Sequence, residues 1–265
     1  MTKEGAIGVF DSGIGGLTVL KELLAGLPGE SFVYFGDTAR VPYGTKSVET
    51  VLKFSRENVT FLLDQSVKFI VVACNTVSAG AVPRLQKEFR IPIVGVIEPG
   101  ARAAVKMSKS SRIGVIGTAG TIRSGAYQRE IKSLDPRAEV FAKACPLFVP
   151  LVEAGWVDTP VTQAAADAYL GEFKERNIDA LVLGCTHYPL LRGVIGRAVG
   201  EGVALVDSAV ETAREVERSL DELGLRNGDG EEDFTVFLSD IAPDFKQVAE
   251  RILGRKIPKV SFRSV

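Results

Sequence analysis

Hydrophobic and polar positions follow two alternating rhythms along the chain. Short, β-branched apolar runs are separated by longer segments in which apolar residues recur with helical periodicity. This alternation is typical of a parallel α/β fold with helices on both faces of the sheet, and such folds bind ligands at the carboxyl ends of their strands. The predicted strands are Ile7–Phe10, Phe32–Phe35, Phe69–Ala73, Ile93–Ile97, Ile113–Ile116, Ala180–Leu183 and Val203–Val206, and clear helical segments are Val48–Leu63, Ala81–Phe89, Thr162–Arg176 and Ala209–Leu223.

Two segments at predicted strand ends each have a similar counterpart later in the chain, in the same order and at nearly equal spacing. The segment 7–13 has a counterpart at 113–119, and 70–76 has one at 181–187. Any two α/β segments share some likeness, which is the alternative explanation. We interpret the pattern as two similar parallel-sheet α/β lobes with the active site between them. The first lobe is predicted to comprise residues 1–97 and 209–265, and the second residues 98–208.

The charge and hydropathy of the chain argue against nucleic acid and membranes as partners. The chain of 265 residues carries 32 Lys and Arg against 33 Asp and Glu, and no basic tract is interleaved with aromatic residues. Nucleic acid is therefore not an expected partner. No apolar run is long enough to cross a bilayer, and the first residues do not form a secretory signal, so neither a membrane nor export is expected. We predict a cytoplasmic protein.

The cysteines are candidates for chemistry rather than for cross-linking or metal binding. Three widely spaced cysteines, a single histidine and no Cys-x-x-Cys motif argue against a disulfide framework and against a transition-metal site. Cys74 and Cys185 each end an apolar run, and polar residues at a turn follow. This places each thiol near a helix N-terminus, which favours the reactive thiolate. A buried core residue is the alternative for either cysteine alone. Cys145 lacks this setting, and for it the core interpretation is preferred.

A matched pair of thiols suits one kind of reaction. Inversion of a carbon next to a carboxylate needs a proton removed from one face and another delivered to the opposite face. Two chemically similar acid–base groups meet that need, provided that one begins deprotonated and the other protonated. Two cysteines, one from each predicted lobe, would meet that requirement across the interface between the lobes.

Four motifs in order resemble those of the glutamate racemase family. They extend from near the start of the chain to about residue 190, and the lengths between them also fit. The segments that carry the resemblance are Asp11-Ser12-Gly13-Ile14-Gly15-Gly16, Gly36-Asp37 with Pro42-Tyr43-Gly44, Ala73-Cys74-Asn75-Thr76, and Gly184-Cys185-Thr186-His187-Tyr188-Pro189.

The resemblance implies a cofactor-independent enzyme that interconverts L- and D-glutamate and supplies D-glutamate for peptidoglycan. It implies that Cys74 works on the D-enantiomer and Cys185 on the L-enantiomer. Asp11 beside Cys74, and Glu153 and His187 beside Cys185, are implied to tune or relay protons. Glu153 is placed only by a less distinctive segment, 150–155. Substrate contacts are implied for Asp11, Ser12, Tyr43, Gly44, Asn75, Thr76, Thr186 and His187.

The residues also support these implied roles independently, with alternatives. Glycines at 13, 15 and 16 allow backbone N–H groups to approach an anion, and short polar side chains are suited to binding a carboxylate and an ammonium. Asn75 and Thr76 are also ordinary helix-capping residues, and His187 has a purely structural alternative. Asp37 either caps a turn or pairs with Arg40.

Other functions remain open at this stage. Gly13-Ile14-Gly15-Gly16 with Asp37 resembles an incomplete dinucleotide fingerprint, so a nicotinamide-dependent enzyme is one alternative. A non-catalytic amino-acid-binding protein and a racemase for aspartate or another acidic substrate are others. His187 favours glutamate because aspartate racemases generally have Glu there. No lysine is singled out for pyridoxal chemistry. The oligomeric state is open, with a homodimer among the alternatives.

Overall fold

The chain forms two compact units in the computed structural model, which describes residues 2–228, 230, 233–243 and 245–264. The first unit contains the chain up to Val96 and again from Ala209 onward, and the second contains Ile97–Ser208. The first crossing between the units thus lies one residue before the predicted boundary at residue 97. Because the chain leaves the first unit and returns to it, that unit is built from two separate stretches of sequence.

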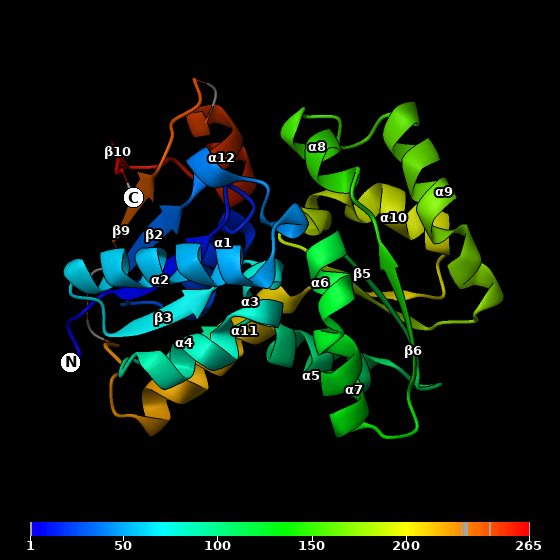
Figure 1. Cartoon of the computed structure of the whole chain (residues 1–265), viewed down its shortest axis with the longest axis horizontal. Helices are drawn as coiled ribbons and strands as arrows, with labels where there is room; N and C mark the ends of the chain where they lie inside the picture. Colours follow the sequence, from blue (N-terminus) through cyan, green and yellow to red (C-terminus); the bar gives the residue numbers. More distant parts are fainter. Residues whose placement is uncertain (1, 229, 231–232, 244, 265) are drawn as a thin grey trace. The chain divides into compact units, whose positions relative to one another are not determined.

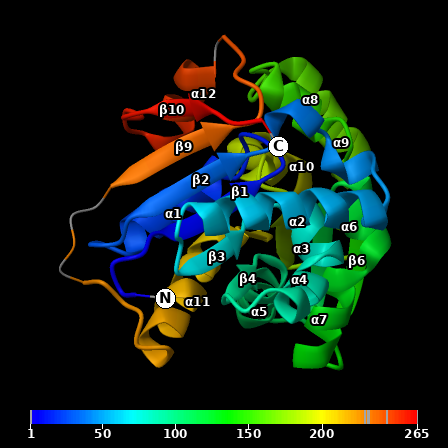
Figure 2. The same ribbon diagram turned by 60° about the vertical axis from the view of Figure 1, so that its left-hand side comes forward.

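The sheet of the first unit is parallel throughout. Its strand order is β10-β9-β2-β1-β3-β4, and Figure 2 shows β9, β2, β1 and β3 side by side with their arrows in one direction. Every residue of β1 and β3 is buried, which explains why these strands have continuous apolar runs. The strands are β1 (Ile7–Asp11), β2 (Phe32–Gly36), β3 (Phe69–Val72), β4 (Ile93–Gly95), β9 (Phe234–Leu238) and β10 (Val260–Phe262).

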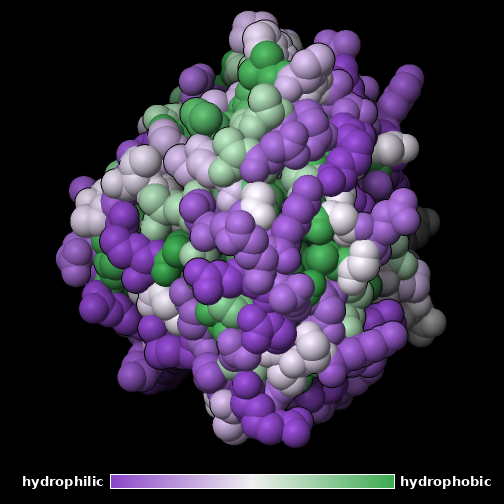
Figure 3. Space-filling model, turned by 90° about the vertical axis from the view of Figure 1, so that its right-hand side faces the viewer, coloured by the Kyte–Doolittle hydropathy of each residue, from purple (hydrophilic) through white to green (hydrophobic). Residues whose placement is uncertain are grey.

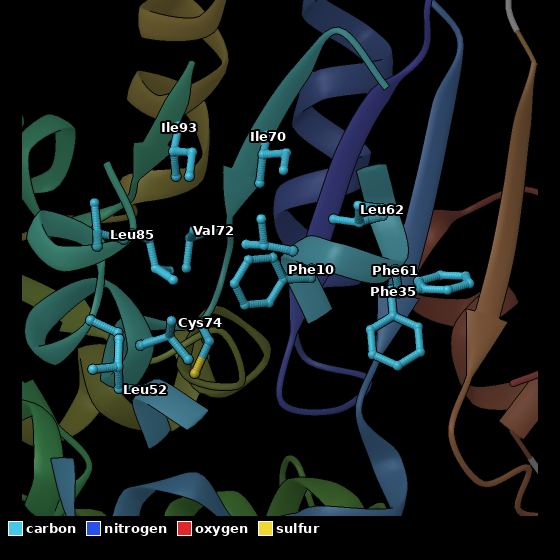
Figure 4. Close-up of a cluster of buried hydrophobic side chains, with 14 of the residues drawn as sticks. Phe10, Phe35, Leu52, Phe61, Leu62, Ile70, Val72, Cys74, Leu85 and Ile93 are labelled. Carbon is cyan, nitrogen blue, oxygen red and sulfur yellow. The ribbon is translucent and has the colours of Figure 1, made fainter. Parts of the chain in front are cut away.

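Helices cover this sheet and close its core. In α2, Ser47 caps the first turn by accepting a hydrogen bond from the Thr50 N–H at 3.2 Å, an arrangement that satisfies one of the free donors of a helix start. The buried face of α2 packs Leu62 and its neighbours against side chains of β1 and β3 (Figure 4). The helices are α1 (Leu17–Gly26), α2 (Val48–Asp64), α3 (Asn75–Gly80), α4 (Val82–Glu88), α11 (Ser208–Glu222) and α12 (Phe245–Leu253), with the 3-10 turns η1 (Thr38–Arg40) and η2 (Tyr43–Thr45).

The second unit has a smaller sheet, also parallel, with the order β6-β5-β7-β8. A second apolar cluster forms where α8, α9 and α10 meet β7, and the three helices are labelled in Figure 1. The strands are β5 (Arg112–Gly117), β6 (Glu139–Ala144), β7 (Ala180–Gly184) and β8 (Ala204–Val206), and the helices are α5 (Ile97–Met107), α6 (Ala119–Ser124), α7 (Ala126–Leu134), α8 (Phe148–Glu153), α9 (Pro160–Glu175), α10 (Arg192–Val199) and the 3-10 turn η3 (Tyr188–Leu191).

The two sheets repeat one topology. The order β2-β1-β3-β4 in the first unit corresponds to β6-β5-β7-β8 in the second. The register agrees as well, because Phe10 pairs with Val72 and Ile116 pairs with Leu183. Cys74 and Cys185 each follow the paired residue by two positions. The prediction of two similar parallel-sheet α/β lobes is confirmed, and the cysteines occupy equivalent places in them.

Some elements differ from the sequence prediction. The strand predicted over Ile93–Ile97 ends at Gly95, and Ile97 is the first residue of α5. Pro99 lies within the first turn of that helix, where a missing N–H costs nothing. Strands β6, β9 and β10 were not predicted at all.

Figure 3 shows one face on which hydrophobic residues occur in small groups among hydrophilic ones. Trp156 and Leu147 are exposed, so they are not part of the core. Within the described stretches, no helix combines the length and apolar character that crossing a bilayer requires.

Candidate functional site

Cys74 lies just beyond the carboxyl end of β3 and is the residue from which α3 begins. Figure 4 shows its sulfur at one end of the apolar cluster, beyond Val72. The thiol is 5% exposed, and Cys74 Sγ lies 3.6 Å from Ser12 Oγ, within hydrogen-bond range for sulfur. The sequence prediction of a thiol at a strand end and a helix start therefore describes this cysteine correctly.

The turn after β1 carries Asp11 and Ser12. Asp11 is the last residue of the strand and is fully buried. The Gly13 N–H donates a hydrogen bond to Asp11 Oδ2 at 3.0 Å. A Cβ at Gly16 would lie 2.4 Å from Asp11 Cβ, closer than any real contact. Gly16 is thus required because the Asp11 side chain packs against it, a reason that the sequence analysis did not supply.

Tyr43 and Gly44 lie in η2, which packs against α3. The Tyr43 side chain is buried, and its hydroxyl donates a hydrogen bond to the Asp37 carboxylate. Burial and the negative charge of Asp37 raise the pKa of the Tyr43 hydroxyl far above its ordinary value, so the hydroxyl stays protonated. The buried Asp37 carboxylate thereby anchors the turn that presents Tyr43 and Gly44.

Asp37 has further partners within the first unit. Arg40 Nε lies 2.6 Å from Asp37 Oδ2, and the Ser239 hydroxyl donates to Asp37 Oδ1 at 2.9 Å. Of the two roles left open for Asp37, the ion pair with Arg40 is the one observed. A carboxylate engaged on both oxygens and fully buried is poorly suited to bind a ribose, which argues against the nicotinamide alternative.

Asn75 and Thr76 are the first two residues of α3, and both are buried. Cys74 itself occupies the capping position, and its side chain makes no capping hydrogen bond. Asn75 and Thr76 are thus the two residues that follow the N-cap position rather than the N-cap itself. Their amide and hydroxyl groups lie at the same helix start as the thiol.

Cys185 follows β7 directly and is 6% exposed. His187 Nδ1 lies 3.9 Å from Cys185 Sγ and 3.5 Å from Thr186 Oγ1. The segment that follows differs from the prediction, because η3 comes first and the α-helix α10 begins only at Arg192. The immediate polar neighbours of Cys185 are thus side chains rather than an α-helix start.

Glu153 joins this second group from α8. Its Oε1 lies 3.3 Å from His187 Nε2, and its side chain is 40% exposed. The imidazole therefore stands between the buried thiol and a carboxylate that reaches solvent. The structure brings together Cys185, His187 and Glu153, although the sequence segment around Glu153 was the least distinctive of those considered.

Cys145 belongs to the core of the second unit. Its side chain is fully buried, and burial raises the pKa of the Cys145 thiol to about 12. The Tyr188 hydroxyl donates to the Cys145 carbonyl oxygen at 2.9 Å. A thiol that is neutral and inaccessible is not suited to acid–base chemistry, in agreement with the sequence interpretation.

The candidate residues thus form two groups, one in each unit, at the carboxyl ends of equivalent strands. Tyr34 was not predicted from the sequence as a site residue, although this fully buried tyrosine of β2 donates its hydroxyl to the Gly13 carbonyl oxygen at 2.7 Å. The available signal was a tyrosine inside an otherwise apolar buried strand, since a buried hydroxyl needs a partner. The first group comprises Asp11, Ser12, Tyr43, Gly44, Cys74, Asn75 and Thr76, and the second comprises Glu153, Cys185, Thr186 and His187.

Comparison of the sequence with known families gives one model that spans most of the chain. The family described as Asp/Glu/Hydantoin racemase matches residues 7–216. A glutamate racemase from Geobacter metallireducens is 55% identical over 257 residues, which cover 96% of this chain and 95% of that protein.

Solved structures are similar over almost the whole chain. Glutamate racemase isoform RacE1 from Bacillus anthracis superimposes with a TM-score of 0.94 at 42% identity, and covers 99% of this chain and 98% of its own. Glutamate racemase from Francisella tularensis, solved in complex with D-glutamate, has a TM-score of 0.92 at 39% identity with the same coverage.

Proposed function

Since this chain belongs to the Asp/Glu/Hydantoin racemase family, we propose that it is a glutamate racemase that uses Cys74 and Cys185 as its two acid–base groups. One observation carries the proposal. The two thiols occupy the same position after equivalent strands of a repeated topology, in a chain 55% identical to a glutamate racemase. Equivalent placement is what a reaction with interchangeable bases needs.

The reaction consists of two proton transfers. A thiolate takes the α-proton of glutamate, and the electron pair of the broken C–H bond stays on the substrate as a carbanion next to the carboxylate. The opposite thiol then gives its proton to the other face, which leaves the first sulfur protonated and the second ionised. We assign Cys74 to the D-enantiomer and Cys185 to the L-enantiomer. The mechanism requires both sulfur atoms within reach of one α-carbon.

The polar neighbours would assist each thiol differently. Asp11, held by the Gly13 N–H, and the Ser12 hydroxyl serve the side of Cys74. His187, with Glu153 behind it, serves the side of Cys185. Short polar groups at both strand ends would bind the substrate ammonium and carboxylates, and we assign this role to Asp11, Ser12, Tyr43, Gly44, Asn75, Thr76, Thr186 and His187.

The biological role follows from the product. D-glutamate is a component of peptidoglycan, so we place the enzyme in the cytoplasm, where it would supply this amino acid for cell-wall synthesis. The proposal needs no cofactor, because the thiols themselves remove and return the proton. The proposal is also compatible with a homodimer.

Incubation of the purified protein with D- or L-glutamate in deuterated water, without any added cofactor, tests the function. We expect the optical rotation to decay to zero from either enantiomer, with deuterium at the α-carbon of the product. Aspartate and alanine in parallel incubations serve as controls for the substrate. Saturable binding of glutamate without α-hydrogen exchange would instead indicate a binding protein. Faster inversion of aspartate than of glutamate would show that aspartate is the preferred substrate.

A further inference from the structure

Tyr34 holds the turn that carries Asp11 and Ser12. It lies in the middle of β2, opposite Val9 of β1, and its side chain is fully buried. Its hydroxyl donates a hydrogen bond to the Gly13 carbonyl oxygen at 2.7 Å. The tyrosine is thus connected to the centre of the β1 turn, although it comes from the neighbouring strand.

The same glycine connects Tyr34 to Asp11. While the Gly13 carbonyl accepts from Tyr34, the Gly13 N–H donates to Asp11 Oδ2 at 3.0 Å. Ser12, between Asp11 and Gly13 in the chain, places its hydroxyl 3.6 Å from the Cys74 sulfur. A shift of the Gly13 backbone, whose carbonyl and N–H groups lie on either side of one Cα, would therefore affect both the Asp11 carboxylate and the Ser12 hydroxyl.

Gly16 gives independent support for this arrangement. A Cβ built on Gly16 would lie 2.4 Å from Asp11 Cβ and 2.8 Å from the Tyr34 hydroxyl oxygen. The Asp11 side chain and the Tyr34 hydroxyl therefore pack against the same bare backbone. No side chain fits between them without displacing one or the other.

The Tyr34 hydroxyl acts as a hydrogen-bond donor at all working pH values. Burial, together with the nearby charges of Asp11 and Cys74, raises its pKa well above the ordinary value. It neither takes nor releases a proton during turnover. Its contribution is to fix the geometry of other groups.

We propose that Tyr34 is a positioning residue for the Cys74 half-reaction, because its hydroxyl fixes the turn that presents Asp11 and Ser12 to that thiol. This inference rests on the proposed function and adds a residue outside the recognised motifs. The inference predicts an effect on only one of the two half-reactions. Loss of the hydroxyl should slow proton transfer at Cys74 and leave proton transfer at Cys185 unchanged.

The test must separate the two half-reactions. The two enantiomers have equal free energy, so kcat/KM has the same value in both directions for any variant and cannot locate a defect. The primary deuterium isotope effect can show which of the two half-reactions is impaired. Substrate labelled at the α-carbon transfers its deuterium to Cys74 when it is D-glutamate and to Cys185 when it is L-glutamate.

The variant Tyr34→Phe keeps the ring and removes only the hydroxyl. We expect kcat to fall roughly 10-fold with KM changed less than about twofold, as for the loss of one positioning hydrogen bond. The isotope effect should rise with labelled D-glutamate, because the Cys74 step becomes more rate-limiting, and fall with labelled L-glutamate. Tyr188→Phe is the matched control, since Tyr188 is also fully buried and donates to a backbone carbonyl, but in the second unit. It should not raise the isotope effect with D-glutamate.

Gly16→Ala provides a second variant in case Tyr34→Phe does not fold. Its added methyl group presses on Asp11 and on the Tyr34 hydroxyl, so it should shift the isotope effects in the same direction. Unchanged isotope effects from both enantiomers in these variants, or a rise on the L side, would overturn the role of Tyr34. Failure of the wild-type protein to invert glutamate in the same assay would instead overturn the proposed function, and the role of Tyr34 with it.

Discussion

The polar groups around the two candidate thiols differ in their access to solvent. On the side of Cys74, Asp11 is fully buried. On the side of Cys185, His187 contacts both the thiol and Glu153, whose side chain is 40% exposed. The proposed reaction is chemically symmetric, but its two thiols would have asymmetric surroundings, so the two proton transfers should respond to different substitutions.

Asp11→Asn and His187→Asn should each lower kcat, by about 10²-fold if the side chain assists proton transfer. The two variants should differ in which step becomes slow. We expect Asp11→Asn to increase the primary isotope effect from α-deuterated D-glutamate and His187→Asn to increase that from the L-enantiomer. Identical isotope patterns in the two variants would contradict their assignment to opposite thiols.

Cys145 should have a stability role that depends on pH. Burial raises the pKa of its thiol to about 12 in the folded state, against an ordinary value near 9. Below pH 9 the thiol is neutral in both states. Above pH 9 only the unfolded chain ionises, so folding becomes less favourable as the pH rises towards 12.

Cys145→Ala should keep racemase activity and cost on the order of 1 kcal/mol of unfolding free energy at pH 7.5. At pH 10 the wild-type protein should have lost about 1 kcal/mol through ionisation of its unfolded state, so the difference should nearly vanish. Urea unfolding of both proteins at the two pH values measures this. A difference that grows with pH would show that the sign is wrong.

At the scale of elements, the sequence predicted best those strands whose residues are all buried. The strands β1, β3 and β7 have continuous apolar runs for this reason. By contrast, β6 lies at a sheet edge with no fully buried residue. Its residues, which include Glu139 and Lys143, follow no apolar pattern. The strand β6 forms because it pairs with β5. A local sequence pattern does not show which strands will pair.

A buried ion pair also escaped the sequence analysis. Lys68, just before β3, lies 2.6 Å from Glu30, just before β2, and both side chains are fully buried. Glu30 also accepts a hydrogen bond from the Asn227 N–H at 2.8 Å. The pair stands at the amino ends of the strands, at the other end from Cys74. Two charges far apart in the sequence give no local signal of such a contact.

Lys68→Met should reduce the unfolding free energy by about 3–5 kcal/mol, because it leaves the Glu30 carboxylate buried without its counter-ion. The double variant Lys68→Met/Glu30→Met should recover most of that loss. Urea unfolding of the wild type, of Lys68→Met and Glu30→Met, and of the double variant gives the coupling energy. Equal losses in the single and the double variant would show that the lysine stabilises the fold by packing alone, without the ion pair.

The internal repeat of the molecule could be recognised from the sequence because the repeated segments are buried strand ends. The matched segments around Cys74 and Cys185 predicted two similar lobes, and the strand orders β2-β1-β3-β4 and β6-β5-β7-β8 confirm them. Strands β9 and β10 extend only the first sheet. Side-chain contacts such as Tyr34 with Gly13, or Asp37 with Tyr43, were not predictable, because they depend on which strands become neighbours.

In the proposed mechanism two thiols act on opposite faces of one carbon, so variants that lack a single cysteine should separate their contributions. Isotope exchange at the α-carbon is measured by proton NMR in deuterated water for Cys74→Ala, Cys185→Ala and, as the control, Cys145→Ala. We expect the first two to lose racemisation by at least about 10³-fold. Cys74→Ala should still exchange the α-hydrogen of L-glutamate alone, and Cys185→Ala that of D-glutamate alone, whereas the control should invert both. Inversion of both enantiomers at the wild-type rate by either of the first two variants would contradict the claim.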